Sequence, residues 1–405
     1  MREGGVETRG ERMLAMRKAR MAAAPPILRG GFRPFFLLGA AWAVVALFVW
    51  LTVFFHGLPL PSAFNSLAWH RHEMLFGFVG AVIAGFLLTA IPNWTGRLPI
   101  AGAPLAALAG LWLAARIAVL FSAQLGWIVA AVLDVGFYLV FAFIAGREVV
   151  AARNRNLPAV GIVLLFGIAD AVDYAGAAGL IADADAGVRA GIALVIVLIS
   201  LIGGRVVPSF TRNWMAKQGF KQGLPGQPTR YDQVAIGVTA LAFAGWLLLP
   251  DAQVTGWLLA IAAALQFVRL ARWSGWRTAS DVLVLVLHVG YLWVPVGLAL
   301  LAASVVGSEI PRTAAIHAFT EGAMATMILA MMTRATLGHT GRALKANAAT
   351  ALAYVLVTLG AITRVIAPFG WLDYTDTLAA AGVLWGLAFV VFVAAYGPIV
   401  FRERK

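Results

Sequence analysis

Six histidines are the side chains of this sequence that are best suited to hold a metal. His70 and His72 stand at the start of one long apolar run, and His317 stands near the start of another. Glu321 follows His317 by four residues and therefore shares its side of a helix. Neutral imidazole is the usual protein ligand of haem iron and also suits copper. These residues are the first candidates for a metal or haem site.

The depths of the histidines in a helical bundle can be compared from the rise of about 1.5 Å per residue. Measured from the expected cytoplasmic ends of their runs, His72 lies about 30 Å up and His317 about 25 Å up, so the two can meet. His288 lies only about 13 Å up its own run. It reaches the same metal as His72 only if helices are tilted or broken, and Pro295 is a candidate for such a kink.

Acidic residues inside apolar runs are the candidates for proton transfer, because an ionisable group in a bilayer is costly. Glu73 and Glu321 stand beside the histidines and are the preferred catalytic candidates. Asp170 and Asp173 lie about one turn apart and either carry protons or take part in helix packing. Two further residues in neighbouring runs are expected to form a structural ion pair, namely Arg116 and Asp134. His56 is expected at the membrane interface and His339 in a cytoplasmic loop.

The composition requires a membrane protein around these residues. Of the 405 residues 61% are hydrophobic and 12% charged, whereas a soluble domain is about half apolar and a quarter charged. The 31 Lys and Arg residues lie mainly in short gaps between apolar runs, which excludes a nucleic-acid-binding domain. The absence of cysteine excludes disulfides, thiolate zinc and copper sites, iron–sulfur clusters and CxxCH haem attachment.

An α-helix crosses the hydrocarbon of a bilayer with about 20 apolar residues. The runs do not alternate as the strands of an outer-membrane barrel would, so we expect an all-α polytopic protein. Twelve runs are long enough, at 35–56, 70–92, 103–121, 125–146, 159–182, 187–208, 232–250, 253–271, 279–303, 312–333, 346–366 and 375–400.

Basic residues fall in every second gap between the runs, which predicts the topology. Both termini are expected in the cytoplasm. Residues 1–28 form a cytoplasmic N-terminal segment, disordered or partly helical, and residues 29–405 form one integral membrane domain. Short related motifs that contain arginine follow runs 2, 6 and 10, such as Thr95-Gly96-Arg97 and Thr340-Gly341-Arg342. This spacing suggests three four-helix units around a pseudo-threefold axis.

Several longer words in the chain occur together. They are Gly31-Phe32-Arg33-Pro34-Phe35-Phe36, Trp69-His70-Arg71-His72-Glu73-Met74-Leu75-Phe76-Gly77, Gly204-Arg205-Val206-Val207-Pro208 and His317-Ala318-Phe319-Thr320-Glu321-Gly322-Ala323-Met324. In this combination the chain resembles the NnrS family of bacterial inner-membrane proteins, from about residue 29 to the end. One departure is Arg71, where the family usually has a small residue.

The resemblance implies a twelve-helix protein of the bacterial inner membrane that contains haem b, with copper also found in the family. It implies a role in denitrification and in protection against nitric oxide. A weaker likeness exists to haem-copper oxidases, whose low-spin haem is held by histidines of helices 2 and 10; His70 or His72 with His317 fits that plan. An oxidase-type site needs six histidine ligands, so this chain can hold a single haem with a second metal, copper or another non-haem metal, near Glu321.

The leading hypothesis is a membrane protein that reduces NO to N2O with electrons from membrane quinol. The expected ligands are His72 and His317, then His70, then His288. Glu73 or Glu321 delivers protons, and the arginines that neutralise haem propionates are Arg71, Arg116 and Arg364. The alternatives are a non-catalytic protein that binds NO or haem or handles haem or copper, and a secondary transporter. The expected partners are membrane lipid, NO and quinol, with no nucleic acid and no evident partner protein.

Overall fold

The computed structural model describes residues 9–307 and 309–404, and within these ranges it contains helices and no strands. Twelve helices of the described part are long and apolar enough to span a membrane, which confirms the predicted all-α polytopic fold. They are Phe32–His56, Ser66–Thr95, Ala103–Leu120, Trp127–Ala151, Leu157–Ala177, Ala186–Lys217, Arg230–Leu248, Gln253–Arg277, Val282–Val306, Arg312–His339, Ala348–Phe369 and Tyr374–Val400.

Most of these spans are single α-helices, and three are built from several segments. The single helices are α2 (Phe32–His56), α5 (Ala103–Leu120), α7 (Trp127–Ala151), α8 (Leu157–Ala177), α11 (Arg230–Leu248), α12 (Gln253–Ala271), α13 (Val282–Val306), α16 (Ala348–Ile366) and α17 (Tyr374–Val400). Short elements flank them, namely α1 (Arg9–Ala23), η1 (Pro26–Leu28), α6 (Ser122–Leu125), η4 (Gly275–Arg277) and η6 (Ala367–Phe369).

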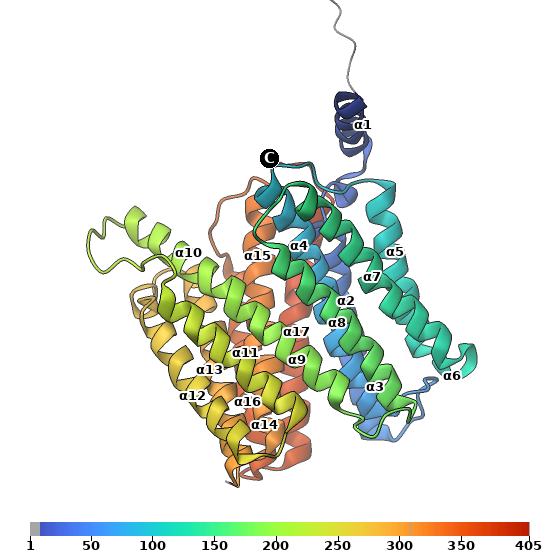
Figure 1. Cartoon of the computed structure of the whole chain (residues 1–405), viewed down its shortest axis with the longest axis vertical. Coiled ribbons are helices and arrows are strands. Elements are labelled where there is room, and N and C mark those ends of the chain that lie inside the picture. The colour runs from blue at the N-terminus through green and yellow to red at the C-terminus, as the bar shows by residue number, and fades with distance from the viewer. Residues whose placement is uncertain (1–8, 308, 405) are drawn as a thin grey trace, which may run out of the picture.

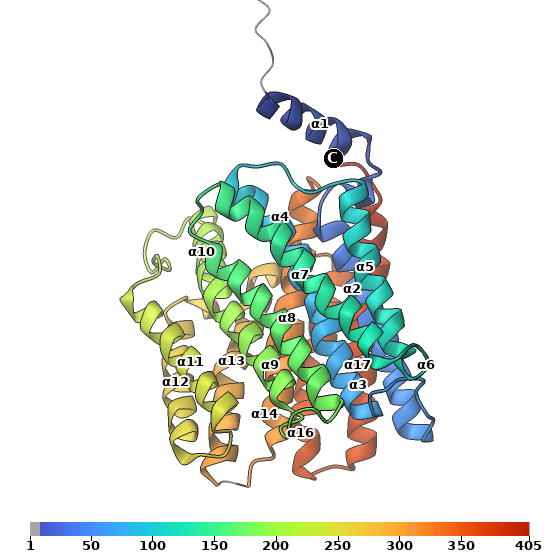
Figure 2. The ribbon, with the colours of Figure 1, turned by 45° about the vertical axis from the view of Figure 1, so that its right-hand side comes forward.

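The spans form one bundle in which helices that follow one another in the chain pack side by side (Figure 1). The last span, α17, packs against the first, α2. The C-terminus and α1 lie at the same end of the bundle, which we name the terminal end (Figure 2). We name the other end the opposite end. The N-terminal segment includes the helix α1, and residues 1–8 lie outside the described part.

Spans 2, 6 and 10 differ from the others because each contains a π-helical segment. Span 2 consists of α3 (Ser66–His72), η2 (Glu73–Val79) and α4 (Gly80–Thr95). Span 6 consists of α9 (Ala186–Leu198), η3 (Ile199–Gly203) and α10 (Gly204–Lys217). Span 10 consists of α14 (Arg312–His317), η5 (Ala318–Ala325) and α15 (Thr326–His339). These are the spans that carry the repeated sequence words, while the pseudo-threefold axis stays a prediction.

A π-helical turn changes the hydrogen-bond pattern of the backbone and leaves carbonyl groups for other donors. In η2 the carbonyl of Gly77 accepts from Trp112 Nε1 at 3.0 Å, and the carbonyl of Phe76 accepts from the Tyr138 hydroxyl. In η3 the carbonyl of Ser200 accepts from Arg269 at 2.9 Å. Among the described residues, no side chain of another helix donates to a carbonyl of η5. The π segment of span 10 is therefore the one whose carbonyls receive no hydrogen bond from the side chains of other described helices.

Candidate functional site

The side chains expected to do chemistry lie in two clusters near the opposite end, the first buried and the second partly buried. The first, which we name the His72 cluster, consists of His72, Asp134, Asp170 and Asp173, from α3, α7 and α8. His72 Nδ1 lies 2.8 Å from Asp173 Oδ2, and His72 Nε2 lies 2.9 Å from Asp134 Oδ2. Asp170 Oδ1 is 3.8 Å from the same Nε2. The imidazole is thus enclosed by three carboxylates.

Arg116 of α5 connects this cluster to Glu73. Its guanidinium donates to Glu73 Oε2 at 2.8 Å and to Asp134 Oδ1, which confirms the predicted Arg116–Asp134 ion pair. Glu73 Oε2 also accepts from Trp42 Nε1 at 2.6 Å. All of these ionisable groups are fully buried. Glu73 is therefore held in an ion pair, and its position is fixed by two helices.

The second group, which we name the His317 cluster, consists of His70, His317, Glu321 and Arg364. His317 Nδ1 lies 2.7 Å from the carbonyl oxygen of Thr313, and a carbonyl can only accept, so Nδ1 carries the proton. Its Nε2 then has a free lone pair. Arg364 and His70 are the electrostatic neighbours of His317. A histidine that donates one ring N–H to a backbone carbonyl is oriented as a metal ligand usually is.

Polar atoms without partners gather in the His317 cluster. Arg364 makes no hydrogen bond to any described residue, and its nearest carboxylate oxygen is Glu321 Oε1 at 4.0 Å. Glu321 Oε2 and His70 Nδ1 are buried and have no partner in the described part of the chain. The ring of His70 stacks on Trp50 with centroids 4.0 Å apart. Buried polar atoms are normally hydrogen-bonded, so this set points to a group that the protein binds.

Three buried arginines lie beside the π segments and differ in their hydrogen-bond partners. Arg116 has two carboxylate partners. Arg269, beside η3, donates to Asp232 at 2.9 Å, to Ser200 and to Tyr291 at 2.9 Å. Only the arginine beside η5, Arg364, lacks hydrogen bonds among the described residues. The guanidinium groups of Arg116 and Arg269 are thus paired within the protein, whereas that of Arg364 has unused hydrogen-bonding capacity.

The structure groups the expected ligands differently from the expected pairing of His72 with His317. His70 is the neighbour of His317, whereas the side-chain polar partners of His72 come from α7 and α8. The physical reason is helix rotation. Residues two positions apart on an α-helix are rotated by about 200° about its axis, so their side chains point to nearly opposite sides. His70 and His72 therefore cannot both face span 10.

The other expected site residues lie apart from these clusters. Arg71 donates to Asp185 at 2.8 Å, in the loop between α8 and α9, and so has a partner of its own. His288 Nε2 lies 2.8 Å from Thr211 Oγ1 of α10. His56 is exposed at the end of α2. His339, expected in a loop, is instead the last residue of α15, because that helix continues past the apolar run.

The loop that joins α8 to α9 closes the His72 cluster at the opposite end. Arg189 donates hydrogen bonds to Asp183, which lowers the pKa of this exposed carboxyl. Gly187 packs on the backbone of Asp173, where an added Cβ would lie 2.3 Å from the amide nitrogen. A larger residue at this glycine would separate α9 from α8. The loop is thereby held close over the histidine and its carboxylates.

Sequence reasoning did not predict that three aspartates surround His72. The sequence predicts Asp134 only as the partner of Arg116, and it leaves Asp170 and Asp173 open between proton transfer and helix packing. The sequence does carry a signal for this cluster. Acidic residues are rare within apolar spans, and these three aspartates lie on two consecutive spans. The network of Arg269 with Asp232 and Gln266 was also missed, although each interrupts an apolar run.

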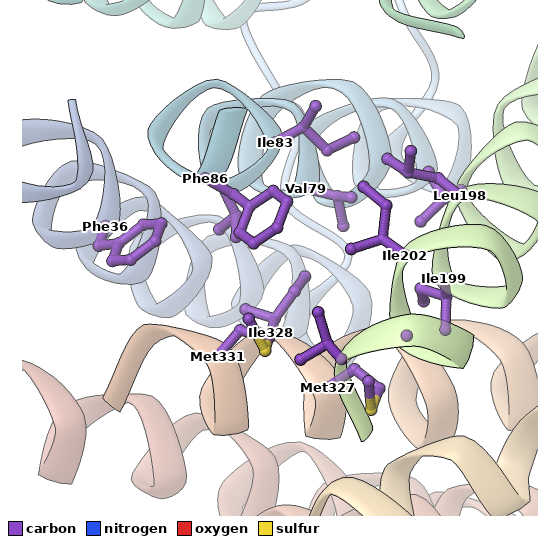
Figure 3. A pocket seen from close by; sticks show the side chains of 14 residues that line it. Phe36, Val79, Ile83, Phe86, Leu198, Ile199, Ile202, Met327, Ile328 and Met331 are labelled. Atoms are coloured by element: carbon purple, nitrogen blue, oxygen red, sulfur yellow. The ribbon is translucent and has the colours of Figure 1, made fainter. Parts of the chain in front are cut away.

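An apolar chamber of about 90 Å³ lies between spans 2, 6 and 10 (Figure 3). Fourteen residues line it, all apolar, including Phe36, Ile83, Ile202 and Met327. A second cavity shares part of this lining and continues to the terminal ends of α4 and α15. Its mouth carries three arginines, namely Arg155, Arg205 and Arg334.

The family model described as NnrS protein matches residues 26–404, which is nearly the whole chain. The chain belongs to the NnrS family. A search of curated proteins finds no match. Membership of the NnrS family fits a multi-pass membrane protein that contacts lipid, is linked to nitric oxide and carries haem or another metal. The His317 cluster has the free imidazole nitrogen, the unpaired guanidinium and the unpaired carboxylate oxygen that such a group would use.

Proposed function

We propose that this NnrS-family protein is a haem b-containing protein of the bacterial inner membrane that reduces nitric oxide to nitrous oxide. The observation that carries the proposal is the His317 cluster, where buried donors and acceptors have no partner among the described residues. Two molecules of NO, two electrons and two protons give one N2O and one water. The electrons come from membrane quinol, because the chain has no cysteine for a thiolate copper centre or CxxCH haem.

Each residue of the His317 cluster is assigned its own contact with the haem. His317 would hold the haem iron through Nε2, since Nδ1 is used by the Thr313 carbonyl. His70 is the second candidate ligand, oriented by its stack on Trp50. Arg364 has a free Nη1 for a propionate. When bound, the haem supplies an iron that coordinates NO and accepts electrons.

Protons reach the site through side chains of this chain. Glu321 is the preferred donor because its Oε2 has no partner and lies on the same helix side as His317. Glu73 is held by Arg116 and Trp42, so we assign it to positioning that network. Copper or another non-haem metal near Glu321 stays part of the proposal, with the free Oε2 as one ligand atom.

The first experiment is spectroscopic. Wild type purified in detergent is expected to show a reduced-minus-oxidised spectrum of b-type haem that shifts on addition of NO. His317→Ala is expected to lose it, and His70→Ala to lose or alter it. His56→Ala is the matched control, because His56 is exposed at the end of α2. No haem in well-folded wild type would overturn the proposal.

Turnover is the second test and separates catalysis from binding. Glu321→Gln is expected to keep the haem spectrum and to reduce N2O formation from NO and quinol by about 10²- to 10⁴-fold, the usual contribution of general acid catalysis. NO binding without N2O from the wild type would instead establish the non-catalytic alternative.

A further inference from the structure

We propose that His72, Asp134 and Asp170 bind a divalent metal ion at a site distinct from the His317 cluster. One ligand atom from each residue can be chosen so that all three lie within 4.8 Å of one another. The three side chains are fully buried and come from three helices, α3, α7 and α8, of which α8 packs against both others (Figure 2). Such convergence in a membrane interior points to a bound cation.

The distances suit a small ion with tetrahedral ligands. A tetrahedral metal with bonds of about 2.1 Å separates its ligand atoms by about 3.4 Å. His72 Nε2 lies 2.9 Å from Asp134 Oδ2 and 3.8 Å from Asp170 Oδ1, one on each side of this value. The carboxylate oxygens of Asp134 and Asp170 lie within 4.8 Å of each other, and the ion would draw the three ligand atoms to equal spacing. The fourth position is left for water or another ligand.

The neighbours of the three ligands orient them as the partners of metal ligands do. Asp173 Oδ2 lies 2.8 Å from His72 Nδ1, which directs the Nε2 lone pair at the ion in a carboxylate–histidine–metal arrangement. Asp134 is held by Arg116 and accepts from the Tyr174 hydroxyl at 3.4 Å. Asp173 and Arg116 therefore hold His72 Nδ1 and Asp134 Oδ1, and the ion would replace the contact between His72 Nε2 and Asp134 Oδ2.

Asp170 supplies the independent observation. Both of its carboxylate oxygens are buried and neither has a hydrogen-bond partner among the described residues, yet it faces His72. An unpaired carboxylate in a membrane interior is one of the most unfavourable groups that a helix can carry. A ligand role explains why an aspartate occupies this position.

The charges of the site also favour a bound cation. Glu73, Asp134, Asp170 and Asp173 are four buried carboxylates around one permanently charged partner, Arg116. A neutral imidazole leaves this set with excess negative charge, which a low-dielectric interior does not tolerate. A divalent ion removes most of that excess.

The ligand set indicates the class of metal. One imidazole with two carboxylates and no thiolate favours Zn²⁺, Fe²⁺ or Mn²⁺ over a soft ion such as Cu⁺. The side-chain polar partners of His72 belong to α7 and α8, so the ion does not share a ligand with His317.

The experiment measures metal content on the full-length protein purified without chelator. Wild type is expected to hold about one divalent ion per chain in elemental analysis, with haem iron counted separately by its pyridine complex and subtracted. Asp170→Asn is expected to lose this ion while keeping its haem and its elution as a single species. Because Asp170 makes no hydrogen bond to a described residue, the substitution keeps the shape of the side chain and removes no hydrogen bond. Asp251→Asn is the matched control, since the side chain of Asp251 is 76% exposed, and it is expected to keep the ion.

A second measurement tests metal binding through the thermal stability of the protein. After treatment with EDTA, addition of Zn²⁺ or Mn²⁺ is expected to raise the thermal midpoint of wild type and not that of Asp170→Asn. Wild type with no ion beyond haem iron and no saturable response to Zn²⁺ or Mn²⁺ would overturn the proposal. Neither readout depends on NO turnover, so this inference and the proposed function can fail separately.

Discussion

Arg116 is completely buried and binds carboxylates of two other helices. Its loss would leave the charges of Glu73 and Asp134 uncompensated inside the bundle. Removing one partner of a buried ion pair costs about 3–5 kcal/mol. We expect Arg116→Met to lower the thermal midpoint and the yield of folded protein in detergent.

A triple variant is the control for this prediction. Arg116→Met combined with Glu73→Gln and Asp134→Asn removes the charges together, and replacement of a whole buried ionic group is often close to neutral. Because Asp134 is also a proposed metal ligand, the variants are compared after EDTA treatment, and the triple variant is expected to recover the thermal midpoint of wild type treated in the same way. A single variant as stable as wild type would show that the ion pairs do not support the fold.

At the scale of residues, the sequence predicted which side chains take part in polar contacts better than it predicted which way each side chain points. The Arg116–Asp134 pair was predictable because opposite charges in neighbouring apolar spans have few other partners. The division between His70 and His72 was not, because the rotation of a helix about its axis depends on packing with its neighbours. The sequence identified both histidines and left open which of them faces span 10.

Each π segment changes the rotation of one half of its span about the helix axis relative to the other half. An uninterrupted α-helix would set a different rotation. Deletion of Ala323 from η5 would remove one residue and rotate α14 by about 100° relative to α15. We expect the deletion variant to insert into the membrane and to lose the haem spectrum, because His317 and Arg364 no longer face each other. Deletion of Gly226, in the exposed loop between α10 and α11, is the control and should keep the spectrum.

Close packing of spans 2 and 4 depends on Gly80. A Cβ at this position would lie 1.9 Å from the hydroxyl oxygen of Tyr138. We expect Gly80→Ala to destabilise the protein by about 1–3 kcal/mol, as overpacking does, and thermal unfolding would measure it. Gly136→Ala should be neutral, because nothing lies within 4 Å of its added Cβ. Tyr138→Phe in the Gly80→Ala background removes the clashing oxygen and should restore part of the loss.

At the scale of elements, the apolar runs predicted all twelve spans, because burial in hydrocarbon requires a continuous apolar length. The ends were less predictable. Span 6 was expected to end at residue 208 and continues to Lys217, since its polar last turns extend beyond the apolar run. The π segments carry no sequence signal of this kind, because one additional residue in a turn does not change the hydropathy of a span.

The topology of the whole molecule can be tested through the absence of cysteine. Single cysteines at Ala182, an exposed position in the loop between α8 and α9, and at Gln222, an exposed position near the terminal end, provide unique labelling sites. With both termini cytoplasmic, a membrane-impermeant maleimide should label Ala182→Cys in spheroplasts and Gln222→Cys only after lysis. The reverse pattern would contradict the orientation proposed from the basic gaps.

The apolar chamber between spans 2, 6 and 10 has a consequence for the order of the reaction. A cavity walled by hydrocarbon excludes water and ions and accepts small uncharged molecules, as apolar cavities in other proteins do. If the protein consumes two molecules of NO as we propose, the chamber would keep a second molecule inside the protein while the first is bound. The second encounter would then take place within the protein, and its rate would depend less on how dilute the gas is outside.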